Sequence, residues 1–274
     1  MDTTQTPATF RELHQSGCFV IANPWDIGSA RYLASLGFRA LATTSAGLSF
    51  SMGRPDCPTS LNRAIALQNI RDLVEATVLP VNADFQAGYG DAPEDVAESV
   101  ALCVGTGVAG LSIEDATGDD DHPLYELPVA LARLRAARAA IDSSGRDVLL
   151  TGRAECFLVG HPSPLRESIE RLVAYADAGA DCLFAPGLKT PEQVREVVAA
   201  VSPRPVNVLA ADPSWMTLHR LADLGVRRIS VGSALARVAW SALMAAASEI
   251  ATDGTFAGLT RAESFTTLNR LFSD

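Results

Sequence analysis

The chain has little positive charge, which argues against a nucleic-acid-binding protein. Its 274 residues include 22 Lys and Arg against 32 Asp and Glu, a formal net charge of −10. Binding to a phosphate backbone needs a basic face, and the sequence supplies none. An acidic protein can still bind a small acid where local arginines, a metal and backbone N–H groups reverse the field. We therefore expect no nucleic-acid partner.

Signals for secretion and for a membrane span are also lacking. Residues Met1 to Pro7 are polar and contain no apolar signal core. No apolar run reaches the ~18 residues that a membrane span requires. The five cysteines are odd in number and form no CxxC pair, which is typical of reduced thiols. We expect a cytoplasmic protein with no membrane partner.

A GxGxxG pattern occurs at Gly105–Gly110, but it leads from an expected helix into an expected strand, the reverse of the dinucleotide-binding fingerprint. No P-loop occurs, so a nucleotide-binding fold has no support. The sequence instead contains eight short, almost continuously apolar segments, as expected of strands buried on both faces. These are Cys18–Asn23, Ala40–Ser45, Leu79–Phe85, Gly110–Glu114, Val148–Arg153, Cys182–Pro186, Pro205–Leu209 and Arg228–Gly232. Helical patterns separate them, with apolar residues three and four apart. They cover Arg31–Leu36, Leu61–Ala76, Pro93–Val104, Pro128–Ile141, Leu165–Ala178, Pro191–Val201 and Ser214–Leu224.

A glycine stands between helix and strand at four similar junctions. A glycine there is typical of a left-handed helix C-cap, and its repetition at unit spacing indicates βα repeats. The four are Gly37, Gly107, Gly179 and Gly225. The sequence thus predicts an α/β fold, a (β/α)8 barrel, as one domain over residues 1–274. The barrel and its eighth helix take about 10–250, and a helical extension takes 251–274.

The expected eighth helix, Ser233–Ile250, is alanine-rich and apolar on nearly all sides, and Leu259–Leu271 could form another helix after it. A helix that is apolar on more than one face must bury more than one face. A contact between subunits would achieve this, as would packing under the last helix, and the sequence alone favours neither.

An apolar strand that ends in an acid occurs twice. Leu79–Phe85 carries Asp84, and Gly110–Ile113 leads into Glu114 and Asp115, with Glu114 placed 30 residues after Asp84. Adjacent parallel strands would bring these acids together at one rim, where oxygen ligands suit Mg²⁺. Alternatively, Asp84 and Asp115 are N-caps of the helices that follow. For the pair, we favour the metal.

Further candidates lie where strands end, because barrels carry their chemistry there. Arg153 follows the apolar Val148–Leu150 and needs an anion, either a substrate carboxylate or a neighbouring acid such as Glu155 or Glu114. Ser45–Leu48 is expected to be a small, flexible turn whose N–H groups can form a nest for a carboxylate or phosphonate oxygen. The remaining candidates are Thr44, Asp56, Gln86 and Asn207.

Together these segments resemble the isocitrate lyase/phosphoenolpyruvate mutase superfamily, from about Phe10 to the eighth barrel helix. The resemblance is carried by Ser45-Ala46-Gly47-Leu48-Ser49, Arg54-Pro55-Asp56, Asp84-Phe85-Gln86-Ala87-Gly88-Tyr89-Gly90, Ile113-Glu114-Asp115, Gly152-Arg153-Ala154-Glu155 and Ala178-Gly179-Ala180-Asp181. It implies an α/β barrel, Mg²⁺, and small 2-oxo or 2-hydroxy acids whose C–C or P–C bond breaks through an enolate. It also implies an eighth helix exchanged within a dimer, with dimers pairing into tetramers.

The resemblance implies roles for single residues. Asp84 would touch the metal, Asp56 and Glu114 would act largely through metal-bound water, and Arg153 with the Ser45–Leu48 turn would hold the acid. The expected metal-site residues are Asp84, Asp56, Gln86 and Glu114, and the expected catalytic residues are Asp56, Arg153 and Glu114. The expected substrate-binding residues are Thr44, Ser45, Gly47, Leu48, Asp84, Arg153 and Asn207.

The chain departs from the family pattern at three places. Gln86 stands where many members carry a second Asp, so the site has one negative charge fewer. The segment from Glu114 to Val148 contains no cysteine, whereas the lyases carry a Lys-Lys-Cys-Gly-His loop there. Pro186 stands where mutase-like members place a histidine.

We therefore predict a Mg²⁺-dependent homo-oligomeric enzyme that cleaves a small 2-oxo acid resembling oxaloacetate. The alternatives are an isocitrate- or methylisocitrate-type lyase, and a protein that binds a 2-oxo acid with little turnover.

Overall fold

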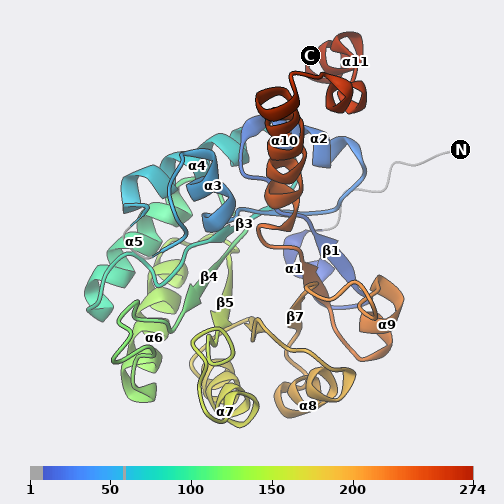
Figure 1. Ribbon diagram of the computed structural model, residues 1–274. Helices are drawn as coiled ribbons and strands as arrows, with labels where there is room; N and C mark the ends of the chain where they lie inside the picture. Colours follow the sequence, from blue (N-terminus) through green and yellow to red (C-terminus); the bar gives the residue numbers. More distant parts are fainter. Residues whose placement is uncertain (1–8, 58–59, 274) are drawn as a thin grey trace, which may run out of the picture.

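The barrel forms from eight parallel strands. The structure, a computed structural model, describes residues 9–57 and 60–273. The strand order is β1-β8-β7-β6-β5-β4-β3-β2. β1 and β2 meet through a bridge between Ala22 and Leu41, so the sheet is nearly closed. Helices surround the strands (Figure 1), and the predicted (β/α)8 fold is confirmed.

Each of the eight predicted strand segments contains a strand. The strands are β1 (Phe19–Ile21), β2 (Leu41–Ala42), β3 (Val81–Asp84), β4 (Gly110–Glu114), β5 (Leu149–Arg153), β6 (Cys182–Phe184), β7 (Val206–Leu209) and β8 (Arg228–Ser230). The helices are α1 (Phe10–Leu13), α2 (Ile27–Ser35), α3 (Ser45–Ser51), α4 (Arg63–Glu75), α5 (Pro93–Gly105), α6 (Leu127–Ser143), α7 (Pro164–Asp177), α8 (Pro191–Val201), α9 (Leu218–Asp223), α10 (Ala234–Asp253) and α11 (Phe265–Phe272), with a 3-10 helix, η1 (Ala257–Arg261).

Three predicted helices have clearly different bounds. The predicted Arg31–Leu36 starts earlier, as α2, because Asp26 caps it. Ser214–Leu224 is helical only over α9, because Thr217 caps that helix by accepting a hydrogen bond from the Arg220 N–H. Leu259–Leu271 is interrupted, since η1 ends at Arg261 and Ser264 caps a separate helix, α11. The four junction glycines have φ between +84° and +103°, which confirms the predicted left-handed turns between helix and strand.

A short helix that the sequence analysis missed, α1, covers the amino-terminal end of the barrel. Its Phe10 ring lies so close to Gly110 that a Cβ there would be 2.7 Å from it. Phe10, Leu13 and Phe19 form an apolar cluster at the start of the strands. The larger core lies between the strands and α5 to α8. One end of the barrel is therefore filled, and its carboxyl end remains open for a site.

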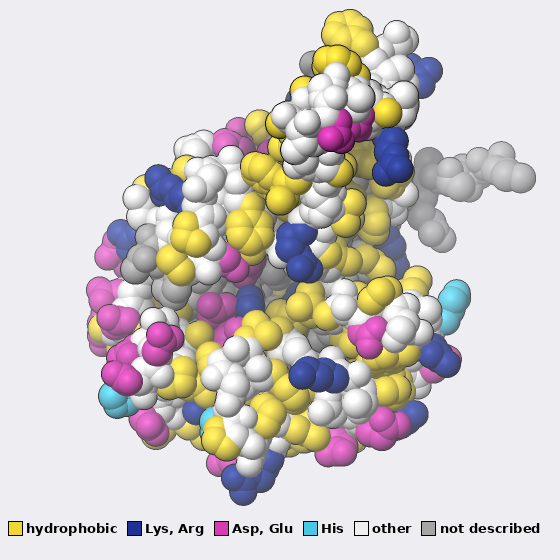
Figure 2. All heavy atoms as spheres, in the orientation of Figure 1, with side chains coloured by type: hydrophobic (Ala, Val, Ile, Leu, Met, Phe, Trp, Pro, Cys, Tyr) yellow, Lys and Arg dark blue, Asp and Glu magenta, His cyan; other side chains and the backbone are white. Residues whose placement is uncertain are grey.

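Helix α10 extends away from the barrel (Figure 1), and much of its apolar surface is exposed (Figure 2). Among the described helices it alone is long and apolar enough to cross a membrane by length and composition, which is weak evidence by itself. Arg237 and Glu249 interrupt this helix, so its sequence is not a continuous apolar run. Its exposed side chains include Val238, Trp240, Leu243 and Met244.

Candidate active site at the carboxyl end of the barrel

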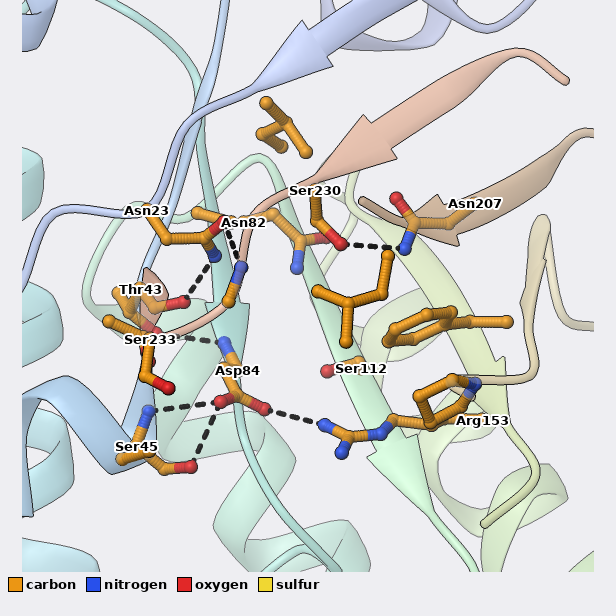
Figure 3. A pocket seen from close by; sticks show the side chains of 18 of the residues that line it. Asn23, Thr43, Ser45, Asn82, Asp84, Ser112, Arg153, Asn207, Ser230 and Ser233 are labelled. Carbon is orange, nitrogen blue, oxygen red and sulfur yellow. Dashed lines mark hydrogen bonds and ion pairs between the residues drawn. The ribbon is translucent and has the colours of Figure 1, made fainter. Parts of the chain in front are cut away.

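A cavity of about 180 Å³ opens at the carboxyl ends of the strands. Figure 2 shows acidic and basic side chains in the hollow at the centre of this face. Figure 3 shows side chains from several strands pointing into the cavity. Of the predicted site residues, those that line it are Thr44, Ser45, Asp56, Asp84, Arg153 and Asn207.

Asp84 ends β3 and lies at the start of α3. Its Oδ2 accepts hydrogen bonds from the Ser45 N–H at 2.9 Å and from the Ser45 hydroxyl at 3.0 Å. Its Oδ1 accepts one from Arg153 Nη1 at 3.2 Å. The positive end of the helix dipole stabilises a carboxylate in this position. Asp84 is therefore held in place facing the cavity, and it does not cap the helix that follows it.

The predicted flexible turn at Ser45–Leu48 is wrong, because these residues form the first turn of α3. Thr44 is the N-cap, and its hydroxyl accepts the Gly47 N–H at 3.2 Å. A Cβ on Gly47 would lie 2.6 Å from the Thr44 methyl group, so this position requires glycine. The Ser45 and Gly47 N–H groups are thus already used. Gly47 and Leu48 do not line the cavity, whereas Ala46, which the sequence analysis did not single out, does.

Arg153 ends β5 and pairs with three acids. Its Nη1 lies 3.2 Å from Asp84 Oδ1 and 3.1 Å from Glu114 Oε2, and its Nε donates to Glu155. The charges of these acids raise the pKa of the guanidinium above its ordinary value, although burial opposes them. Of the two partners expected for Arg153, a substrate carboxylate or a neighbouring acid, the structure shows neighbouring acids. The Nη2 group has no hydrogen-bond partner among the described residues, and it can still bind a carboxylate.

Glu114 ends β4 on the far side of Arg153. It lines a second cavity of about 400 Å³ together with Gln86, Tyr89 and Tyr125. Burial raises the pKa of Glu114 to about 8, in spite of the attraction of Arg153. Gln86 has a φ of +46°, unusual for a residue other than glycine. The two predicted metal-site residues Glu114 and Gln86 thus border the adjoining cavity, and Asp84 and Asp56 border the central one.

Asp56 reaches the central cavity from the exposed loop after α3. Partial burial and the charge of Asp84 both raise the pKa of Asp56, and Arg153 opposes them. The two carboxylates repel each other across the cavity, and a cation bound between them would remove this repulsion. Mg²⁺ needs only one or two protein carboxylates and keeps several waters. Ser45 uses both lone pairs of Asp84 Oδ2 and Arg153 uses one of Oδ1, which leaves one lone pair on Oδ1 for the ion, so these residues fit it.

Asp115, the neighbour of Glu114, has a structural position. It is buried and accepts hydrogen bonds from the Glu155 N–H at 2.8 Å, the Tyr175 hydroxyl at 2.6 Å and Arg171 Nη1 at 3.1 Å. It does not cap a helix. The bond from the Glu155 N–H joins the ends of β4 and β5, and the bonds from Tyr175 and Arg171 connect them to α7. Together these bonds fix the backbone that carries Glu114 and Arg153.

The barrel interior below the site is polar, and its residues Asn82, Ser112, Arg228 and Ser230 were not predicted. Asn207 donates to the Ser230 hydroxyl at 3.0 Å and accepts from Arg228 Nε at 2.9 Å. Asn23, Asn82 and Ser112 also line the cavity. The available signal was the spacing of polar residues within apolar strands, since Asn82 and Asp84, like Arg228 and Ser230, are two apart and share a face.

The raised pKa of Glu114 predicts a pH dependence of stability in metal-free protein. The pKa of Glu114 is ordinarily 4.5, the value expected in the unfolded chain, and about 8 when folded, so the unfolded state binds fewer protons between these values. The free energy of unfolding should therefore fall as pH rises through this window. Glu114→Gln should reduce the slope, and urea unfolding with a chelator present measures it. An equal slope in both proteins would contradict the assignment.

Comparison with known proteins shows the family of this chain. The family model for phosphoenolpyruvate phosphomutase matches residues 10–251. A crystal structure from Burkholderia cenocepacia J2315, assigned as a lyase/mutase, is 46% identical, with a TM-score of 0.92, and covers 97% of this chain and 95% of that one. Oxaloacetate acetylhydrolase in complex with oxalate is 26% identical, with a TM-score of 0.85, and covers 96% and 92%. Oxaloacetate decarboxylase 1 of Pseudomonas putida (strain W619) is 32% identical over 241 residues, 82% of this chain and 78% of the relative.

Proposed function

We propose, since this chain belongs to the phosphoenolpyruvate mutase family and is an enzyme of the lyase type, that it cleaves a C–C bond of a small 2-oxo acid with Mg²⁺ bound. Oxaloacetate is the first substrate to test. One observation carries the proposal: the carboxylates of Asp84 and Asp56 and the guanidinium of Arg153 line one small cavity at the carboxyl end of the barrel. The compartment we propose is the cytoplasm.

Asp84 and Asp56 would hold the ion, which supplies Lewis acidity where negative charge develops on the 2-oxo oxygen. Arg153 Nη2 would bind the carboxylate of the acid, and the contacts of Arg153 with Asp84 and Glu114 fix its orientation. Ser45 and Ala46 border the same space at the positive end of α3. These groups would hold the carboxylate and the 2-oxo group in one plane, the arrangement in which an enolate can form.

Protonation of the enolate needs a donor close to the cavity. Pro186 lines the cavity and carries no acid, and Asn207 is bonded to Ser230 and Arg228. In a decarboxylation, water that enters from the open mouth of the cavity can supply this proton. A lyase that cleaves isocitrate must instead deliver a proton to a larger leaving group inside a closed site. This difference favours decarboxylation over cleavage of isocitrate.

Steady-state assays on a panel of 2-oxo acids, with Mg²⁺ and with a chelator, test the proposal. We expect Mg²⁺-dependent release of CO₂ from oxaloacetate, and slower turnover of acids without a second carboxylate. Saturable binding of oxaloacetate without turnover would instead identify a binding protein. Release of glyoxylate or pyruvate from isocitrate or methylisocitrate would identify a lyase of that type.

The exposed face of α10 supports a homo-oligomer, and we propose a dimer of dimers built through it. Val238, Leu243 and Met244 are 66%, 56% and 63% exposed on this helix. A patch of this kind is typical of an interface between subunits. Leu243→Glu should shift the mass measured by light scattering towards the monomer. Val78→Glu, at a fully exposed apolar residue away from α10, is the matched control. A wild-type monomer at micromolar concentration would contradict the proposal.

A further inference from the structure

Arg228 is a buried cation inside the barrel. It begins β8 and is 3% exposed. Its Nε donates to Asn207 Oδ1 at 2.9 Å, and its Nη2 donates to Thr151 Oγ1 at 3.0 Å. Its Nη1 lies 3.5 Å from Asn82 Oδ1 and 3.4 Å from His14 Nε2. The guanidinium therefore crosses the interior and contacts groups on β7, β5 and β3 and at the C-cap of α1.

Each of these partners is neutral. His14 Nδ1 lies 2.8 Å from the Phe10 carbonyl and must donate to it, so Nε2 is the acceptor that faces Arg228. Burial and the charge of Arg228 lower the pKa of His14 to about 3. No ion pair joins Arg228 to a carboxylate within residues 9–57 and 60–273, and burial lowers the pKa of Arg228. Arginine nevertheless stays charged in proteins, so its positive charge has no counter-ion here.

A buried charge without a counter-ion is costly, and proteins normally pair it. Hydrogen bonds from neutral oxygens compensate only part of the lost hydration. The acids of the site do not provide the counter-ion, because Asp84, Glu114 and Glu155 already pair with Arg153. A small anion beside Arg228 would therefore be stabilised electrostatically.

The central cavity reaches Arg228, so an anion has a path to it. Arg228 and Ser230 line this cavity together with Asp84 and Arg153. Figure 3 shows Asn82, Asn207 and Ser230 at one end of the pocket and Asp84, Ser112 and Arg153 at the other. The Ser230 oxygen accepts the Asn207 amide at 3.0 Å, which leaves its hydroxyl hydrogen free to donate. Of the five N–H groups of Arg228, the contacts above use four, which leaves one on Nη2. The floor thus offers a positive charge, one guanidinium N–H and one hydroxyl that can donate hydrogen bonds.

We propose that the floor of the cavity is a second binding site, for one small anion of about carboxylate size held by Arg228 and Ser230. The anion is either a free inorganic ion or a carboxylate of a bound acid, and both would receive the same hydrogen bonds. The site depends on the charge of the floor, and it does not require the reaction proposed above.

Soaking crystals of the full chain in sodium bromide tests the site. We expect an anomalous peak beside the Arg228 guanidinium and the Ser230 hydroxyl. Arg228→Gln should remove the peak. Arg227→Gln is the matched control, because its side chain bonds the Gly17 carbonyl at the surface, so the same charge is lost elsewhere. No peak in the wild type, or a peak that persists in Arg228→Gln, would overturn the proposal.

Thermal unfolding in solution separates a site from an adventitious ion. Bromide should raise the melting temperature of the wild type and of Arg227→Gln, with a concentration dependence that follows mass action. The rise should be smaller in Ser230→Ala. This variant keeps the Arg228 cation, so it tests the site even if Arg228→Gln does not fold. Equal rises in wild type and Ser230→Ala, or none in either, would mean an adventitious ion only and overturn the proposal.

A second soak, with malate added to the bromide, distinguishes the two sources of the anion. If malate displaces bromide and its carboxylate density lies at Arg228, the site receives a carboxylate of the bound acid. If bromide stays beside bound malate, the site holds a free ion. Malate that displaces bromide without density at Arg228 would contradict a specific anion site.

Discussion

Asp84→Asn should lower kcat/KM for oxaloacetate by at least about 100-fold, the loss typical when a group that stabilises transition-state charge is removed. The substitution keeps the shape of the side chain and removes the negative charge that faces Asp56 across the cavity. Arg153 would retain Glu114 and Glu155 as partners, so the barrel should still fold. Steady-state kinetics and Mg²⁺ titration by calorimetry measure the two effects.

The control for this variant is Asp72→Asn, which removes the same charge from α4. Asp72 accepts a hydrogen bond from Gln68 at the surface, away from the cavity. We expect its activity and Mg²⁺ affinity to match the wild type. Unchanged Mg²⁺ affinity in Asp84→Asn would show that the ion is not held by this carboxylate.

Cleavage of isocitrate and methylisocitrate should be slower than decarboxylation of oxaloacetate by roughly 10²–10⁴-fold, the usual contribution of a positioned general acid. The loop between β4 and α6 contains no cysteine. Its other acidic groups are poorly placed to replace one. Tyr125 donates to Asp91 at 2.6 Å, and its pKa is raised to about 12, while His122 and Asp119 pair at 3.7 Å on the exposed surface.

Both lyase assays, for glyoxylate and for pyruvate, should use the enzyme preparation that is active on oxaloacetate, with Mg²⁺ saturating. A low rate is then a property of the site and does not reflect inactive protein. Turnover of either substrate near the ~10 s⁻¹ of a median enzyme would show that another group serves as the acid.

The strands could be predicted because buried strands appear in the sequence as short, continuous apolar runs. The turns at the junction glycines could be predicted because their positive φ values strongly favour glycine. Helix α3 could not be predicted. Its sequence, Ser45 to Ser51, contains three serines and Gly47, and both residue types have low helix propensity. Its start is fixed by Thr44 and by the carboxylate of Asp84, which lies 39 residues away from Ser45 in the chain. A contact of this length leaves no local pattern.

In the candidate site too, some residues could be predicted from local sequence and others could not. Asp84, Asp56 and Arg153 were predicted because each lies beside a strand end or in a loop of the mouth, and the structure brings them to one cavity. Their proximity does not follow from spacing, and neither does the position of Gln86 and Glu114 beyond Arg153. Arg228 was overlooked because it begins an apolar strand, where an arginine suggests a solvent-facing end. Only the closure of the barrel turns it into the interior.

The most direct measurement of the central claim is a crystal structure of the enzyme with Mg²⁺ and oxalate. We predict density for the ion bound by Asp84, with oxygen ligands at about 2.1 Å, and oxalate between the ion and Arg153. Asp56 should lie on the same side of the cavity as the ion. Density for oxalate elsewhere, or an ion bound away from Asp84 with the central cavity filled only by water, would contradict the account.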